Sequence, residues 1–163
     1  MILVIIIIII SVLCICFSII LYIIHPKSYN KISFKETLDL TDLPIVTFEQ
    51  NGNKINFLLD TGANRSVINK AILSNYTYTE LEANNTLSGL DGIKRVVDNI
   101  NMNINYGDAV FEETFQVSDL SPIFDSIKQE TGATLHGILG NAFFQKYKYV
   151  IDFNSLMFYS RKK

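Results

Sequence analysis

One aspartate in this chain stands where its side chain could do acid–base chemistry. Asp60 follows the apolar run 55–59 and precedes the small residues Thr61, Gly62 and Ala63. Such a run is typical of a strand packed in a core, and a carboxylate buried at its end is costly unless it is paired or hydrogen-bonded. A catalytic role is the simplest explanation of that cost. The triplet Asp60-Thr61-Gly62 occurs once in the 163 residues, so each chain can supply only one such carboxylate.

The segments that would position Asp60 are short strands separated by turn signals. Between residues 45–48 and 55–59 stands Asn51-Gly52, whose tolerance of positive φ angles predicts a tight hairpin. Alternation of apolar and polar residues predicts further strands with one buried face. The strand-like segments are residues 45–48, 55–59, 96–97, 100–106, 111–117, 149–153 and 156–159.

Helical signals are few and short. A helical turn is expected near residues 69–73, and a helix over 122–129 with Ser121 as its N-cap and Pro122 in the first turn. A second short helix is expected over 141–146, capped by Asn141. The expected fold class is therefore mainly β, with one or two short helices.

Several motifs in this order resemble the retropepsin-like aspartic proteases of clan AA, in particular bacterial single-domain members. The first is Leu58-Leu59-Asp60-Thr61-Gly62-Ala63, and the second is a flap candidate around Gly89 and Gly92. The third is Gly137-Ile138-Leu139-Gly140, followed over residues 140–159 by the pattern of a helix and a terminal hairpin. A lone Asp-Thr-Gly is weak evidence because Asp and Gly are common in turns. Its combination with an apolar-Gly element about eighty residues later is specific.

The resemblance implies a retropepsin-like acid-protease barrel over residues 43–163 and an aspartic endopeptidase activity. In this family two aspartates share one proton, so that one activates a water molecule and the other protonates the substrate carbonyl. Asp60 would be the catalytic residue, supported by Thr61, Gly62 and Ala63. Since the chain offers one Asp60, the second must come from a two-fold related copy, and the expected partner is a second identical chain.

The same resemblance gives roles to four further residues. Leu139 and Gly140 match the apolar-Gly element that packs beneath the catalytic loop, which is a structural role. Gly89 and Gly92 would belong to a mobile flap that closes over a peptide or protein substrate. A plain surface hairpin is an equal alternative for this segment.

The N-terminus is expected to anchor the chain in a membrane. Residues 2–24 contain no Asp, Glu, Lys or Arg, and a helix over 1–24 would be about 35 Å long, enough to cross a bilayer. A cleaved signal peptide is the alternative, but the basic start, short apolar core and small-residue cleavage site that it needs are missing. We therefore expect one retained transmembrane helix.

Residues 25–42 are expected to be a juxtamembrane linker or a strand-like arm. Lys27, Lys31 and Lys35 follow the predicted span, and no basic residue precedes it. Positive charge is retained preferentially on the cytoplasmic side, so a single-pass protein with its catalytic domain in the cytoplasm is expected.

Composition argues against several other classes of function. Both cysteines, Cys14 and Cys16, lie in the predicted span, so the rest of the chain has no thiolate nucleophile. The net charge is −2 and no dense basic stretch precedes the terminal residues 161–163, so nucleic-acid binding is not expected. His136 has no Cys or His at metal-ligand spacing, and we expect neither a metal nor a cofactor.

The sequence thus leads to two hypotheses of different classes. The favoured one is a membrane-anchored aspartic endopeptidase that works as a homodimer through an Asp60/Asp60 pair. The alternative is a non-catalytic, membrane-tethered module of the same fold that binds a peptide strand by β-augmentation. The retained Asp60 favours the enzyme, because a pure binding module has little reason to bury a carboxylate.

Overall fold

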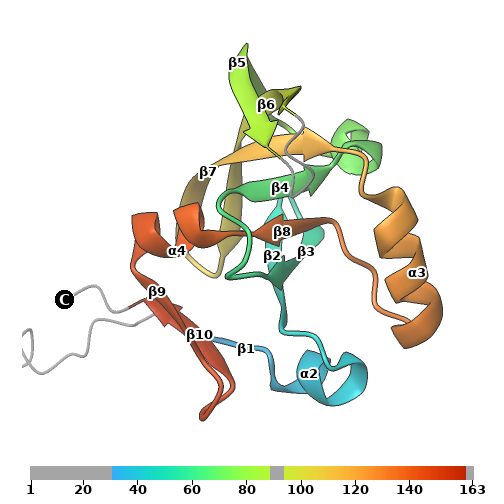
Figure 1. Cartoon of the computed structure of the whole chain (residues 1–163). Helices are drawn as coiled ribbons and strands as arrows, with labels where there is room; N and C mark the ends of the chain where they lie inside the picture. The colour runs from blue at the N-terminus through green and yellow to red at the C-terminus, as the bar shows by residue number, and fades with distance from the viewer. Residues whose placement is uncertain (1–30, 89–93, 161–163) are drawn as a thin grey trace, which may run out of the picture. The chain divides into compact units, whose positions relative to one another are not determined.

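The computed structural model describes residues 31–88 and 94–160 of the chain, and these residues form a mainly β unit (Figure 1). Its strands are β1 (Ile32–Ser33), β2 (Ile45–Gln50), β3 (Asn53–Leu59), β4 (Ser66–Asn69), β5 (Thr79–Ser88), β6 (Lys94–Tyr106), β7 (Ala109–Ser118), β8 (Gly137–Leu139), β9 (Tyr149–Asp152) and β10 (Met157–Ser160). Its helices are α2 (Lys35–Thr41), the 3-10 helix η1 (Lys70–Asn75), α3 (Ser121–Thr131) and α4 (Asn141–Tyr147). The expectation of a mainly β fold is confirmed.

Seven strands form one sheet in the order β2-β3-β8-β4-β7-β6-β5. The end of β2 also pairs with β6, at Glu49 and Asn105, so six of these strands close into a barrel. The short strand β8 lies between β3, to which it is parallel, and β4, to which it is antiparallel. Two segments about eighty residues apart in the sequence, Leu58-Leu59 and Ile138-Leu139, are thereby paired side by side.

The β2–β3 hairpin has the geometry that its turn residues predict. Asn51 and Gly52 have φ angles of 51° and 81°, the positive values required by a two-residue hairpin turn. The strands pair from Ile45 opposite Leu58 to Gln50 opposite Asn53. This register fixes where β3 ends. It therefore also fixes the position of Asp60, which directly follows β3.

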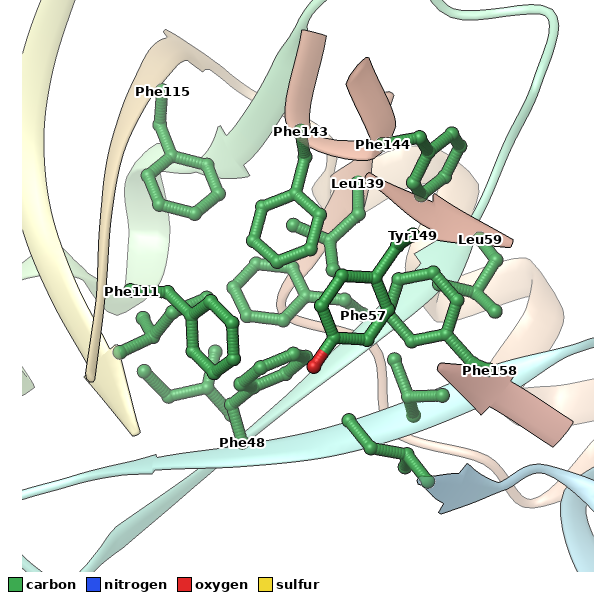
Figure 2. Packing of buried hydrophobic residues seen from close by; sticks show 14 of the residues in the cluster. Phe48, Phe57, Leu59, Phe111, Phe115, Leu139, Phe143, Phe144, Tyr149 and Phe158 are labelled. Atoms are coloured by element: carbon green, nitrogen blue, oxygen red, sulfur yellow. The ribbon is translucent and has the colours of Figure 1, made fainter. Parts of the chain in front are cut away.

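Aromatic side chains fill the inside of the barrel (Figure 2). Phe57 stacks on Phe115 with ring centroids 5.4 Å apart, and Phe48 meets Phe111 edge-on at 5.5 Å. Leu59 and Leu139, the residues that precede the Asp60 loop and Gly140, belong to the same buried cluster. Because both strand ends are anchored in the core, the segments that follow them start from fixed positions.

Part of the segment expected as a linker, residues 25–42, is folded against the barrel. β1 pairs with β10, which pairs with β9, in a second sheet of three strands. Ile32 and Phe34 are buried in the main core, and Phe34 contacts the ring of Phe153 edge-on. The folded unit therefore includes β1 and α2, ahead of the expected boundary at residue 43.

Both helix-capping expectations are wrong. Helix α3 begins at Ser121 itself, with Leu120 as N-cap, because the backbone turns into the helix one residue earlier. Helix α4 begins at Asn141 with Gly140 as N-cap. Asn141 is already inside the helix, and its side chain bonds to another segment of the chain, described below.

The predicted transmembrane helix over residues 1–24 lies outside the described residues. Within residues 31–88 and 94–160, every helix is too short or too polar to cross a membrane. Gly89 and Gly92 also lie outside the described residues. The strands on either side of them, β5 and β6, pair antiparallel as a hairpin should.

His136 joins β3 to the segment that leads into β8, and this contact predicts a pH effect on stability. Its Nδ1 accepts a hydrogen bond from Asn56 N at 2.8 Å, which requires the neutral ring, and burial lowers its pKa below the ordinary 6.5. As the pH falls below 6.5, the unfolded chain binds the proton first, so the free energy of unfolding should decrease. Denaturant titrations between pH 5 and 7.5 should show this decrease.

The matched control is His136→Asn, whose Oδ1 can accept the same hydrogen bond without titrating. This variant should be as stable as the wild type at pH 7.5 and should lack the decrease. An unchanged pH dependence in the variant would show that another group is responsible.

Candidate active site

Asp60 is the first residue after β3, and its backbone is held at a fixed point. Its N–H donates to the carbonyl of Leu139 at 3.0 Å, which continues the pairing of β3 with β8 by one residue. The side chain is partly buried. A buried strand thus places the carboxyl group at the edge of the core and leaves it accessible from outside.

Gly62 holds one oxygen of this carboxyl group. Its backbone N–H donates to Asp60 Oδ1 at 2.8 Å, which fixes the orientation of the carboxyl group. A Cβ atom at Gly62 would lie 3.1 Å from the same oxygen, so even alanine would crowd the carboxylate. Oδ2 of Asp60 accepts no hydrogen bond from any residue of the described segments, so it can face a water molecule or a second carboxyl group.

The loop from Asp60 to Arg65 is tied to the start of α4 by three further hydrogen bonds. Asn141 N donates to Ala63 O at 2.8 Å, and Ala142 N donates to Asn64 O at 3.0 Å. The Asn141 side chain donates from Nδ2 to Thr61 O at 2.7 Å. The amides that open α4 are therefore satisfied by carbonyls of the Asp60 loop, and the loop is held in register with the helix.

Gly140 lies against the underside of this loop. A Cβ atom there would be 2.5 Å from Arg65 O and 2.8 Å from Ala63 O, closer than real Cβ contacts come. Its φ angle is −103°, which any residue can adopt. Glycine is therefore required here by the close approach of two backbone segments and not by a special conformation.

The structure brings most of the predicted site residues together. Asp60, Thr61, Gly62, Ala63, Leu139 and Gly140 all lie in or against one loop. Gly89 and Gly92 are not placed, since they lie outside the described residues. Among residues 31–88 and 94–160, no three His, Cys, Asp or Glu side chains are grouped so that they could hold a metal ion.

Three residues at this site were not recognised from the sequence. Asn141 was interpreted as a helix cap, whereas it bonds to Thr61 O. Ser66, fully buried at the start of β4, accepts a hydrogen bond from Gly140 N at 3.3 Å and donates one to Glu113 Oε1 at 2.8 Å. For Glu113 a signal was present: it stands at an inward position of an alternating strand, between Phe111 and Phe115.

Removal of the Asn141 side chain should weaken the loop without unfolding the domain. Asn141→Ala loses one hydrogen bond and should lower the free energy of unfolding by about 1 kcal/mol. Asn141→Asp should cost more, because it sets an acceptor against the carbonyl of Thr61. Urea titrations check both values, with Asn103→Ala as the control: Asn103 is exposed on the outer face of β6. Equal effects of Asn141→Ala and Asn141→Asp would contradict this reading of the contact.

The fold and the site together define a class of protein. A closed barrel holds a single Asp-Thr-Gly loop against an apolar-Gly element, which is the arrangement of a single-domain aspartic protease fold. The family model for retroviral aspartyl protease matches residues 40–151, more than half of the chain. The chain belongs to this family, and the resemblance to retropepsin-like proteases that its motifs indicated is confirmed.

Among solved structures, the chain is similar to EIAV protease complexed with the inhibitor HBY-793. The identity is 19% and the TM-score 0.44, over 64% of this chain and 86% of that chain. No curated protein matches the chain.

Proposed function

We propose that this chain is a membrane-anchored aspartic endopeptidase that works as a homodimer. The observation that carries the proposal is the hydrogen bonding and partial burial of Asp60 in a chain that belongs to the retroviral aspartyl protease family. One carboxylate oxygen is held by the Gly62 amide at 2.8 Å, and the side chain is only partly buried at the end of a core strand. Such a group is fixed in place and still able to exchange a proton with water or substrate.

The proposed reaction needs two copies of Asp60 that share one proton. The water oxygen attacks the peptide carbonyl carbon while one carboxylate takes a proton from that water molecule. The other carboxyl group gives its proton to the carbonyl oxygen. As the tetrahedral intermediate collapses, the C–N bond breaks, the leaving nitrogen takes up the proton that the first carboxylate had taken from water, and a hydroxyl of the intermediate returns its proton to the second carboxylate. Because the two acids titrate as a unit, neither role belongs to a particular subunit in advance.

Two features of the loop support pairing across a two-fold axis. The chain has one Asp-Thr-Gly triplet, so a single subunit holds half of the required acid pair. Thr61 and Gly62 are exposed, and the Thr61 hydroxyl makes no hydrogen bond with any described residue. That hydroxyl is available to bond to the same loop of a second copy.

Membrane anchoring rests on residues 1–24, and the proposed orientation puts the protease domain in the cytoplasm. Two anchors in one membrane would raise the effective concentration of the subunits for each other and favour the dimer. Extraction of membranes tests this part. The full chain should be released by detergent and not by high salt, and release by salt would overturn the anchor.

Subunit mixing tests the shared site. When wild-type chain and Asp60→Asn chain are exchanged in equal amounts in detergent, random pairing leaves wild-type dimers as about one quarter of the total. Activity should therefore fall to about one quarter of that of an all-wild-type sample with the same total amount of protein. A fall to one half would show that each subunit works alone and would refute the shared site. In the control, the Asp60→Asn chain is replaced by an equal volume of detergent and buffer, which should leave one half of the activity.

A statine-type inhibitor separates the enzyme from the peptide-binding module. Its hydroxyl stands for the attacking water and bonds to both carboxyl groups of a working pair. The wild type should bind this inhibitor at least about 100-fold more tightly than the same peptide without the hydroxyl. Equal binding of both compounds, with no hydrolysis, would favour the binding module.

A further inference from the structure

An acidic side chain lies among the buried residues of the barrel. Glu113 is on β7 between the core residues Phe111 and Phe115, and only 3% of its surface is exposed. Burial raises the pKa of its carboxyl group, an effect that the Ser66 hydroxyl and the Lys146 ammonium oppose. A carboxyl group in this position costs stability compared with an apolar residue of similar size, so its contacts need an explanation.

Those contacts lead to the catalytic loop. Glu113 Oε1 accepts a hydrogen bond from Ser66 Oγ at 2.8 Å, and Ser66 Oγ accepts one from Gly140 N at 3.3 Å. Ser66 directly follows the Asp60 loop and begins β4. Gly140 is the residue against which Arg65 O and Ala63 O pack. The chain of contacts therefore joins the inside of the barrel to both sides of the loop.

The direction of each hydrogen bond matters. A serine hydroxyl has one hydrogen to donate, and here it is given to Glu113. A lone pair of Ser66 Oγ is thereby turned toward Gly140 N. Without an acceptor at position 113, the hydroxyl hydrogen would have to find another partner, and the contact with Gly140 would loosen.

We propose that Glu113 is a positioning residue for the Asp60 loop, which it holds through Ser66 Oγ and the Gly140 amide. The proposal rests on the proposed function, since the loop that it fixes is the one that carries Asp60. The role requires an acceptor and not a charge, because a protonated carboxyl still offers one oxygen to Ser66.

Two other ionisable groups, Lys146 and Tyr147, lie near Glu113, and a substitution that removes the charge of Glu113 would change their electrostatic interactions. Lys146 on α4 has its Nζ 4.0 Å from Glu113 Oε2, and its side chain is 49% exposed, so this ion pair is screened by water. Burial, with a smaller contribution from the charge of Glu113, raises the pKa of the Tyr147 hydroxyl, which donates a hydrogen bond to Glu112 O at 2.5 Å. Neither of these contacts involves the Ser66 hydroxyl.

The kinetic experiment compares Glu113→Gln, Glu113→Leu and Ser66→Ala in the full chain. Glu113→Gln keeps an acceptor oxygen and should keep kcat within about 3-fold of wild type, whereas Glu113→Leu and Ser66→Ala should each lower kcat by about 10- to 100-fold through misplacement of the loop. KM should change much less than kcat. The double variant Ser66→Ala with Glu113→Leu should be no worse than the poorer single variant, since both act through one contact.

Glu112→Leu is the matched control, because Glu112 is the exposed neighbour on the outer face of the same strand. It should leave kcat unchanged. The proposal fails if Glu113→Leu folds and keeps full kcat, if Glu113→Gln is as defective as Glu113→Leu, or if the losses of the single variants multiply in the double variant.

Amide hydrogen exchange gives an answer that does not depend on activity or on a stable leucine variant. Exchange at Gly140, Asn141 and Ala142 should be at least about 10-fold faster in Ser66→Ala than in wild type, with Glu113→Gln close to wild type and the β9–β10 hairpin unchanged. Uniform exchange rates across all variants would overturn the proposal. If the wild type hydrolyses no peptide while these rates change as expected, the proposed function fails and the positioning contact stands.

Discussion

Replacing Asp60 by asparagine should abolish the proposed peptide hydrolysis while leaving the fold and the proposed dimer intact. Asparagine has nearly the shape of aspartate, and its Oδ1 can still accept the hydrogen bond that Gly62 N donates at 2.8 Å. An amide, however, neither takes a proton from water nor gives one to a carbonyl. A loss of kcat/KM of about 10⁴-fold or more is expected, of the size seen when a member of a catalytic group is removed.

The measurement is cleavage of an unstructured peptide library by the full chain in detergent, with thermal unfolding and sedimentation as checks on fold and dimer. Asp108→Asn is the control, since Asp108 is an exposed aspartate in the turn between β6 and β7. It should retain full activity. Turnover by Asp60→Asn above about 1% of wild type would contradict the assignment of Asp60.

Gly140→Ala should destabilise the domain and disable the site at the same time. The new Cβ would meet Arg65 O at 2.5 Å and Arg65 C at 2.7 Å. These are backbone atoms, so no side chain can move aside, and the Asp60 loop has to shift away from α4. Overpacking of this kind costs about 1–3 kcal/mol. A shift of the loop by about 1 Å should lower kcat by about 100-fold.

Gly132→Ala separates the two effects. Gly132 ends α3 with a φ angle of 77°, and a Cβ there would meet no atom within 4 Å. Alanine at this position is strained in the left-handed region, so it should cost about 1–2 kcal/mol. It should nonetheless leave kcat unchanged, because the strain is not at the loop. If both variants lose stability and kcat in the same proportion, the effect of Gly140→Ala on activity is merely one of stability.

Some features around the Asp60 loop were predictable from the amino-acid sequence, and others became visible only in the folded structure. The position of Asp60 after a core strand, the hairpin at Asn51-Gly52 and the apolar-Gly element at Leu139-Gly140 were all predictable. The first two depend on a few consecutive residues, whose alternation and turn preferences act locally. The third was implied by the resemblance to retropepsin-like proteases. The catalytic roles of these residues stay predictions until the variants above are measured.

The contacts beneath the loop could not be predicted in the same way. Asn141 has the sequence signature of a helix cap, and only the position of Thr61 O beside it shows that its amide is used elsewhere. The alternation of residues along β7 indicates that Glu113 points inward, between Phe111 and Phe115. Nothing local, however, identifies Ser66, distant along the chain, as its partner.

The amino-acid sequence by itself therefore determined strands β2, β3, β6, β7, β9 and β10, the main turn and the position of Asp60 after a core strand, since periodicity and turn preference are local properties. Strands β1, β4, β5 and β8 were not predicted. Only the tertiary structure showed that β8 inserts between β3 and β4 and that the carbonyls of Arg65 and Ala63 leave no room for a Cβ atom at Gly140. It alone connected Glu113 to that loop. Such contacts join segments dozens of residues apart, and they are selected by how the whole core packs.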